Sequence, residues 1–442
     1  MDPSWQRTRH RAASEPASVS ATDPPVEVGP HPARWRVLAL VALAEFLGMS
    51  LWFTASAAAP QLSTLWGLDA QQAGWLTTVV QLGFVAGTAS AALLNFADIF
   101  PARRYFAVSA VLGAGVNAAL LLAPGYAAAL LLRFLTGFFL AGVYPPAMKM
   151  IATWFRSSRG LAIGTIIGAL TLGKATPYLV RALEGAELAG VVLTASGGAL
   201  LAALLVGVGY RDGPFPFQRR PFSWGLVGVV VRDRSTRLAI GGYLGHMWEL
   251  YAMWTWIPAF LTAGALALGP RAPSPTWVDV AAFGAIATGA LGCVLGGWWA
   301  DRIGRALWVN LSMAISGACC LIIGFIFGAS FWILVLIAWI WGFFVVADSA
   351  QFGAMVTEVT PSHAVGTALT LQTSIGFLLT MVTIQLVPAI AEVGGWRWAS
   401  PPRSVAPRPS CRRSSGQRRS RASRPRRAFS GSGSRACPVP SR

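Results

Sequence analysis

Long apolar segments dominate this sequence. From Trp35 onward, runs of mostly apolar residues return repeatedly, separated by short polar stretches. A helix of about 20 apolar residues crosses the roughly 30 Å hydrocarbon layer of a bilayer. The runs that reach this length predict eleven membrane spans, at residues 36–59, 72–96, 105–123, 127–149, 160–181, 188–209, 238–263, 278–299, 306–328, 331–353 and 364–390. The chain is therefore predicted to be an all-α membrane protein.

Composition excludes a water-soluble protein. Only 12% of the residues are charged and 55% are hydrophobic, with a mean hydropathy of +0.56. Soluble domains carry about 25% charged residues, so this chain has too few ionic groups to cover a water-exposed surface. A cytosolic enzyme and a disordered chain are both excluded. The five cysteines have no regular spacing, which excludes a disulfide framework and a zinc ribbon, and no cofactor is expected.

The net charge of +18 would by itself suggest a nucleic-acid partner or an anionic membrane surface. The location of the charge argues against nucleic acid. Residues 1–398 carry 23 basic and 17 acidic side chains, whereas residues 399–442 carry 12 arginines and no acid. The charge thus divides between a membrane body and a terminal segment, and we expect membrane lipids as the surface partner.

Basic residues in the loops indicate how the body is oriented. With the N-terminus inside, 18 Lys and Arg residues fall in inner segments and three, Arg181, Arg271 and Arg397, fall in outer loops. Cytoplasmic loops of membrane proteins are enriched in Lys and Arg, so the span count and the orientation support each other. We expect a multi-pass protein of the inner (cytoplasmic) membrane.

Composition also divides the chain into five segments. They are a disordered cytosolic leader (1–34), a bundle of six helices (35–210), a cytosolic linker (211–237), a bundle of five helices (238–398) and a tail rich in Arg, Ser and Pro (399–442). The tail has the composition that out-of-frame reading of a GC-rich gene gives, so our hypothesis is a frameshift near codon 399. The alternative is a genuine basic tail that binds lipid or RNA.

Two loops and one span carry recognisable motifs. After the eighth span the sequence reads Gly297-Trp-Trp-Ala-Asp301-Arg302-Ile-Gly304-Arg305. A weaker copy after the second span keeps Asp98, Arg103 and Arg104. Asp98 and Asp301 are 203 residues apart, which fits a duplicated half. The fourth span contains Arg133-x-x-x-Gly137.

Together these motifs resemble the signature of the major facilitator superfamily over residues 36–398. The resemblance implies two six-helix bundles with a site between them near the membrane midplane, the second bundle here truncated to five spans because the twelfth is missing. It also implies that the loop motif latches one conformation, with Asp301 at a neighbouring helix N-terminus and Gly297 allowing close helix contact. The alternative is that its arginines only anchor the loop at lipid headgroups.

Five ionisable residues interrupt the apolar spans, namely Glu45, Arg133, Lys174, Glu249 and Asp348. A charge at the bilayer centre costs about 2.5–3.5 kcal/mol on insertion scales, so these side chains are expected to face the bundle interior. All but Lys174 fall in spans 1, 4, 7 and 10, the helices that line the central cavity in the family. His246 lies one helical turn before Glu249, close enough to share a proton with it.

These residues are the candidates for proton coupling and substrate contact. Glu249 or Glu45 would carry the proton, and Arg133 and Lys174 would attract an anion. The alternatives are structural ion pairs for the acids, a structural role for Arg133, and simple solvation of Asp348 near the cytosolic end of its span.

Two further patterns concern packing as well as function. Trp52, Trp248 and Trp254 lie away from the span ends and are candidates to line the cavity, although packing is the commoner role. Gly160, Gly164 and Gly168 lie on one face of the fifth span, where they form either a packing stripe or a sliding surface during transport.

We therefore expect a secondary transporter that moves a small solute by rocking of two halves, coupled to protons by symport. The solute is expected to be an organic or inorganic anion, and the protein a monomer without nucleic-acid partners. A transport-inactive or receptor-like homologue and an efflux pump are the alternatives. A membrane-embedded enzyme is not expected, because the sequence contains no nucleophile–base pair or metal-ligand set at helical spacing.

Overall fold

The computed structural model describes residues 31–94, 96–156, 158–183, 188–215 and 223–397, without the side chains of Ala97 and Asp98. Every regular element in these ranges is a helix. The first half contains α1 (Arg34–Met49), α2 (Thr54–Ala57), α3 (Ala59–Trp66), α4 (Ala70–Leu93), α5 (Phe96–Ile99), α6 (Ala102–Ala118), the 3-10 turn η1 (Ala119–Leu122), α7 (Tyr126–Leu140), α8 (Tyr144–Ala152), α9 (Arg159–Leu183) and α10 (Leu188–Gly209).

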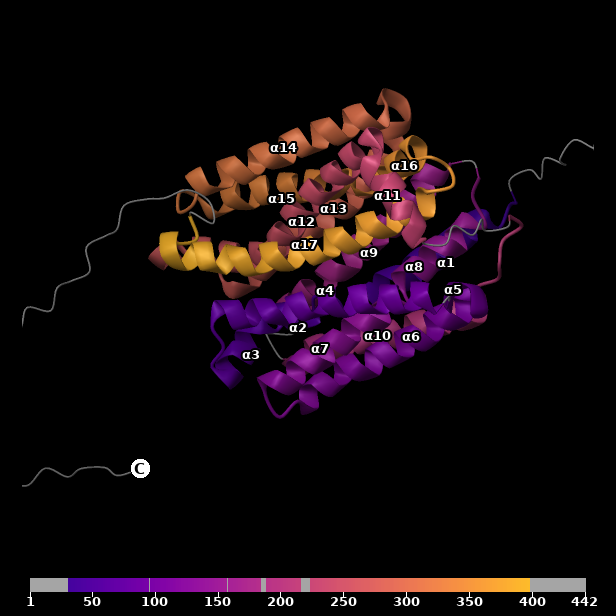
Figure 1. The fold of residues 1–442 in the computed structure, drawn as a ribbon. Coiled ribbons are helices and arrows are strands. Elements are labelled where there is room, and N and C mark those ends of the chain that lie inside the picture. The colour runs from indigo at the N-terminus through magenta and orange to yellow at the C-terminus, as the bar shows by residue number, and fades with distance from the viewer. Residues whose placement is uncertain (1–30, 95, 157, 184–187, 216–222, 398–442) are drawn as a thin grey trace, which may run out of the picture. The chain divides into compact units, whose positions relative to one another are not determined.

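The second half continues with helices that group separately from most of the first. It contains η2 (Trp224–Leu226), α11 (Val227–Arg232), α12 (Arg234–Leu266), η3 (Gly269–Arg271), α13 (Pro275–Ile303), α14 (Arg305–Phe325), α15 (Phe331–Ala347), α16 (Ser349–Val359) and α17 (Val365–Gly394). Figure 1 shows α14, α15 and α17 grouped with α12 and α13, while α4, α6, α7 and α10 lie together.

Nine helical segments of the described chain are long and apolar enough to cross a membrane. They correspond to the predicted spans 2–6 and 8–11. The seventh predicted span is α12, a helix of 33 residues whose aromatic and polar side chains lower its hydropathy. The first predicted span is divided among α1, α2 and α3. The helical membrane architecture expected from the sequence is thereby confirmed.

Three predicted spans are interrupted rather than continuous. The first is broken between Met49 and Thr54, the fourth between Leu140 and Tyr144, and the tenth at Asp348. Prolines in the first turn of α8 explain the second break, because proline is tolerated at a helix start but not in its interior. The other two breaks leave backbone groups without helical partners inside the membrane, so polar side chains are needed there.

Corresponding helix pairs in the two halves meet through glycine. α4 packs against α7, and α13 packs against α15. A Cβ atom at Gly137 of α7 would collide with the carbonyl oxygen of Val80, and one at Gly342 of α15 with that of Ala285. Only glycine permits such close contact of two backbones, which is a common mode of helix packing in membranes. The matching contacts fit the duplication suggested by the sequence.

The halves meet along two helix pairs, α9 with α13 and α4 with α17. The glycine stripe of α9 lies at the first of these contacts. Cβ atoms at Gly164 and Gly168 would lie 2.7 Å from the carbonyl oxygen of Cys293 and 2.9 Å from that of Ala290. This is the location that both a packing stripe and a sliding surface require.

The predicted segment boundaries are only partly covered by the described residues. The leader lies outside them except for residues 31–34, and the tail 399–442 lies outside them entirely. The linker predicted at 211–237 contains α11 and the first residues of α12, with 216–222 outside the described part. The division into five segments and the frameshift hypothesis stay predictions.

Candidate functional site

Arg133 of α7 holds the break between α1 and α2. Its side chain is buried. The guanidinium donates to the backbone carbonyls of Leu51 (3.1 Å) and Trp52 and to Oδ1 of Asn117 (3.0 Å). A cation is favourable where an ended helix leaves carbonyl oxygens unpaired. These bonds favour the structural role for Arg133 over contact with an anion or with Glu45.

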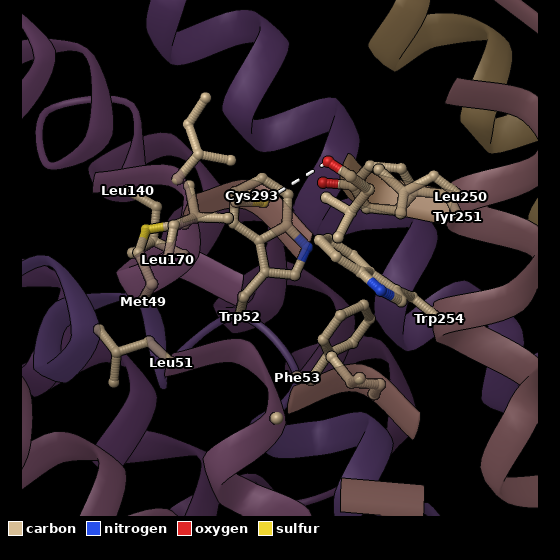
Figure 2. Close-up of a cluster of buried hydrophobic side chains, with 14 of the residues drawn as sticks. Met49, Leu51, Trp52, Phe53, Leu140, Leu170, Leu250, Tyr251, Trp254 and Cys293 are labelled. Atoms are coloured by element: carbon tan, nitrogen blue, oxygen red, sulfur yellow. Dashed lines mark hydrogen bonds between the residues drawn. The ribbon is translucent and has the colours of Figure 1, made fainter. Parts of the chain in front are cut away.

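The break lets two consecutive aromatic residues of the first half face α12. The Trp52 ring lies 6.3 Å from that of Tyr251, and the Phe53 ring lies 6.3 Å from that of Trp254. Figure 2 shows these four side chains gathered where the two halves meet. On a continuous helix neighbouring side chains point about 100° apart, so the interruption allows both to face one partner.

Lys174 of α9 lies among these rings. Its Nζ is 3.8 Å from the centre of the Trp52 ring, 4.9 Å from that of Trp254 and 5.1 Å from that of Tyr251. It donates a hydrogen bond to Tyr251 Oη (2.8 Å), and the residue is 2% exposed. A desolvated ammonium over aromatic faces gains about 2 kcal/mol. We call Trp52, Phe53, Lys174, Tyr251 and Trp254 the central cluster.

Glu45 of α1 is a completely buried carboxyl group near this cluster. The residue is 0% exposed, and neither carboxyl oxygen has a hydrogen-bond partner among the described residues. The titratable groups with which it interacts electrostatically are Lys174 on α9 and Tyr144 on α8. A buried polar group without hydrogen bonds is costly, and ionisable groups kept inside a membrane mark functional sites.

Glu249 of α12 has partners from its own half. Trp341 Nε1 of α15 donates to Oε1 (2.7 Å), and Ser316 Oγ of α14 donates to Oε2 (3.1 Å). Hydrogen bonds to a charged group contribute about 1.5–3 kcal/mol to stability. The sequence makes Glu249 a candidate proton carrier, and this role stays a prediction; both of its carboxyl oxygens accept hydrogen bonds here.

His246 pairs with Asp348 rather than with Glu249. His246 Nδ1 lies 2.9 Å from Asp348 Oδ1, and the two residues are 2% and 1% exposed. Asp348 is therefore buried at the junction of α15 and α16, not solvated as the alternative interpretation assumed. The interruption of the tenth span brings the carboxylate of Asp348 against α12. Residue spacing within α12 could not predict this contact, because Asp348 belongs to another helix. Across the described ranges, no group of three His, Cys, Asp or Glu residues could hold a metal ion.

An ion pair that was not predicted joins the halves where α9 ends and α13 begins. Arg181 Nε donates to Asp279 Oδ2 (2.9 Å), and a second guanidinium nitrogen donates to Oδ1. Arg181 also donates to the carbonyl oxygen of Ala57 at the end of α2. The side chains are only 9% and 10% exposed. In the sequence, Arg181 falls in an outer loop and Asp279 at the edge of a predicted span. Neither residue is therefore expected to have a partner inside the membrane.

The chain matches the family model of the Major Facilitator Superfamily over residues 41–293 and 272–400. The chain belongs to the major facilitator superfamily. Family and helical architecture together identify a multi-pass membrane protein of a secondary-transporter fold, as the loop motif suggested.

Solved structures of superfamily transporters share this fold. The chain is similar to a bacterial homologue of the human lysosomal transporter Spinster, inward-facing and unoccupied (TM-score 0.64, 16% identity, 83% of this chain and 84% of that one). The inward-facing, occupied form gives 0.60, with 17% identity and 83% of each chain covered. A mutant of the nucleoside transporter NupG gives 0.61, with 14% identity, 82% of this chain and 94% of that one. No curated protein matches the chain.

The superfamily loop motif lies where α13 meets the start of α9. Gly304 separates α13 from α14 with a φ of +91°, a conformation that favours glycine. Asp301 Oδ2 lies 3.1 Å from the position of a Cβ atom at Gly160, in the first turn of α9, where the helix dipole favours a carboxylate. Arg305 Nε donates to Glu358 Oε1 (2.8 Å) of α16. The motif thus contacts both halves, as a conformational latch requires.

Two other residues of the motif have local contacts. A Cβ atom at Gly297 would lie 3.0 Å from the carbonyl oxygen of Gly160, so glycine allows α13 and α9 to approach closely. Arg302 donates to the carbonyl oxygen of Trp298 (3.0 Å), and its guanidinium lies 3.3 Å from the centre of the Trp298 ring. Arg302 therefore fits the anchoring interpretation better than the latch.

The weaker copy of the motif is less informative. Arg103 is half-buried and Arg104 is exposed in the first turn of α6, and the side chain of Asp98 lies outside the described residues. The expected role of this copy stays a prediction.

Trp248 does not join the central cluster. It is 38% exposed, whereas Trp52 and Trp254 are 1% and 2% exposed. Six residues along a helix turn a side chain by about 120° around the axis, so Trp248 and Trp254 face different neighbours. The structure brings together Glu45, Lys174, Trp52 and Trp254 near the contact of the halves and gives Arg133, Glu249 and His246 other partners.

Proposed function

We propose that this superfamily member is a proton-coupled symporter of a small anion, with Lys174 as the anion-binding cation and Glu45 as the proton carrier. The observation that carries the proposal is the buried Lys174 side chain in the central cluster. Lys174 comes from the first half and its hydrogen-bond partner, Tyr251, from the second. A ligand at this point would contact both halves, as alternating access around a midplane site requires.

The ammonium of Lys174 is suited to an anion because it forms no ion pair within the described residues, although Glu45 interacts with it electrostatically. The ammonium nitrogen contacts a tyrosine hydroxyl and three aromatic faces. A buried charge is stabilised far more by an opposite charge in contact with it than by a neutral group. An incoming anion supplies that charge.

Glu45 links the anion to a proton through the same electrostatics. When Glu45 takes up a proton, it no longer offsets the charge of Lys174, and an anion binds there more favourably. By reciprocity, a bound anion makes proton uptake at Glu45 more favourable by the same free energy. Symport follows from this coupling, because proton and anion enter and leave together.

The remaining features of the proposal follow from family and charge. The two halves rock around the site, and the protein works as a monomer in the inner membrane with its N-terminus inside, as the loop charges indicate. A transport-inactive or receptor-like homologue is the alternative, in which the same site binds a ligand without moving it. Efflux by proton exchange is distinguished by the direction of the gradient that drives flux.

The test is solute flux into proteoliposomes containing the purified full chain. Uptake of a panel of radiolabelled anions is measured with and without an inward proton gradient. We expect gradient-driven uptake of at least one anion in the wild type and its loss in Lys174→Met. Lys149→Met is the matched control, because Lys149 is the only other lysine of the sequence and lies on α8, away from the central cluster.

Each other result would count against the proposal. Flux that persists in Lys174→Met would remove this residue from anion binding. Binding of anions without any flux would favour the receptor-like alternative. Uptake driven by an outward proton gradient would indicate exchange instead of symport.

A further inference from the structure

We infer that the anion is an organic carboxylate with a flat apolar body, rather than a small inorganic anion, and that Trp52 and Trp254 determine this specificity. The inference rests on the proposed anion site at Lys174 and narrows the chemical class of its ligand. The evidence for this inference is the set of hydrogen-bonding groups in the central cluster that have no partner among the described residues, together with the apolar surface around them.

The unused groups of the cluster include two that can only donate. The indole Nε1 atoms of Trp52 and Trp254 are buried without a partner in the described part of the chain, as is Oη of Tyr178 one turn beyond Lys174. An indole N–H donates and cannot accept. In Figure 2 the indole nitrogen of Trp52 faces Tyr251 and Trp254. Unused donors from both halves therefore lie on rings of the central cluster, which calls for a ligand with acceptors.

Tyr251 occupies the place that a carboxylate would take. Its Oη accepts from Lys174 Nζ at 2.8 Å, so it serves the ammonium as a neutral acceptor from the second half. A carboxylate oxygen can replace this hydroxyl and form a charge-assisted bond, which is about twice as strong as a neutral one. Its second oxygen remains for an indole N–H.

The surroundings of these donors are aromatic. The Tyr251 and Trp254 rings lie 5.6 Å apart, and the Trp52 ring lies 5.1 Å from that of Phe84 and 6.0 Å from that of Phe377. These rings pack against one another in tilted or edge-to-face arrangements, so a ligand that enters when the halves separate would meet aromatic faces. An inorganic oxyanion would satisfy the donors but would leave these faces against a strongly hydrated ion.

The arginine of this region is also committed elsewhere. Small oxyanions are commonly held by the planar fork of a guanidinium, which donates two parallel hydrogen bonds. Arg133 instead uses its two terminal nitrogens for the carbonyls of Leu51 and Trp52 and for Asn117, and only its Nε has no hydrogen-bond partner among the described residues. Lys174 remains, and it acts as a point charge that needs other groups to orient the ligand.

Binding is tested with three aromatic probes of matched size and different charge, and with one small inorganic anion. Benzoate, benzamide, benzylammonium and nitrate are titrated into the purified full chain, and the Kd is measured by isothermal calorimetry. We expect benzoate to bind at least ~10-fold more tightly than the other three, because a single hydrogen bond to a charged group is worth about a factor of ten or more. Lys174→Met should abolish benzoate binding.

The role of the indole donors is tested separately from that of the rings. Trp254→Phe keeps an aromatic ring and removes the N–H, and we expect the Kd for benzoate to rise about 10-fold with little change in thermal stability. Trp248→Phe is the control on the same helix, because Trp248 is 38% exposed and lies apart from the cluster. It should leave the Kd unchanged.

The outcomes separate this inference from the transport proposal. Nitrate bound as tightly as benzoate, with no effect of Trp254→Phe, would overturn the inference and leave an anion transporter. Tight binding of benzylammonium, improved in Lys174→Met, would show that the rings receive a cation in place of the lysine and would overturn both. Selective benzoate binding without flux would support the inference and contradict transport.

Discussion

Two glutamates on corresponding helices have opposite surroundings. Glu45 lies on α1, the first helix of the first half, and Glu249 on α12, the first long helix of the second half. Glu249 accepts hydrogen bonds from Trp341 and Ser316, whereas the oxygens of Glu45 have no hydrogen-bond partner within the described residues. The residue type and the helix correspond, so the difference comes from what the neighbouring helices present. A satisfied carboxylate stabilises one conformation, and an unsatisfied one is available for exchange with a proton.

The same contrast extends to the other buried charges. In the second half, His246 and Asp348 pair with each other within their own half. In the first half, Lys174 finds its hydrogen-bond partner across the interface, on Tyr251. The environment of Lys174 therefore changes when the halves separate, whereas the contact of His246 with Asp348 lies within one half.

The largest effect is expected when Glu45 is replaced. In Glu45→Gln the side chain cannot take up or release a proton, so an inward proton gradient should no longer stimulate anion uptake, a loss of ~10-fold or more if coupling is typical of linked sites. Gradient-independent exchange of anion across the membrane should persist. Both rates are measured in proteoliposomes with the same radiolabelled anion.

Glu249→Gln is the control for this experiment. It removes the corresponding carboxylate of the second half and should leave the stimulation by the gradient intact. If Glu249→Gln loses the stimulation and Glu45→Gln keeps it, the roles that we assign to the two glutamates are reversed, and Glu249 carries the proton.

A smaller effect is expected at the ion pair between the halves. Asp279→Asn leaves the guanidinium of Arg181 buried without its counter-charge. The loss of about 1.5–3 kcal/mol should shift the protein about 10- to 100-fold toward conformations in which this end of the interface is open. The shift is measured as faster maleimide labelling of Thr78→Cys in a background without native cysteines, because Thr78 lies in the contact of α4 with α17.

The matching change at the other end is Glu358→Gln, which weakens the contact of Arg305 with α16. It should not accelerate labelling of Thr78→Cys. Equal labelling rates in the wild type and in Asp279→Asn would show that the ion pair does not control opening.

The smallest effect is expected within the second half. Trp341→Phe removes the indole donor to Glu249 and leaves Ser316 as the remaining partner. We expect the free energy of unfolding to fall by about 1.5–3 kcal/mol with coupling unchanged, measured as a lower Tm by circular dichroism. Trp332→Phe, at a residue 57% exposed, is the control. A change in proton coupling without a change in Tm would contradict a structural role for Glu249.

The sequence alone was sufficient to predict the features that depend on a local pattern of residues. Apolar length predicted the spans, and residues 297–305 predicted the family, which the family model confirms. The interruption of α1 could not be predicted, because the residues at the break other than Ser50 are apolar or aromatic and the stabilising guanidinium comes from Arg133, 81 residues beyond Trp52. Helical spacing predicted that His246 would pair with Glu249. The structure instead places His246 beside Asp348, which lies at the break between α15 and α16. Spacing along one helix cannot report what a second helix brings into contact.

The Arg181–Asp279 contact also limits how fast this protein can work. Any cycle that separates α9 from α13 at this end must first break the pair, so its stability adds to the activation barrier of that step. Every additional ~1.4 kcal/mol of activation free energy slows such a step by a factor of ten. The bonds that keep the two halves closed here therefore set a ceiling on turnover, and a chain selected for speed would be expected to weaken them.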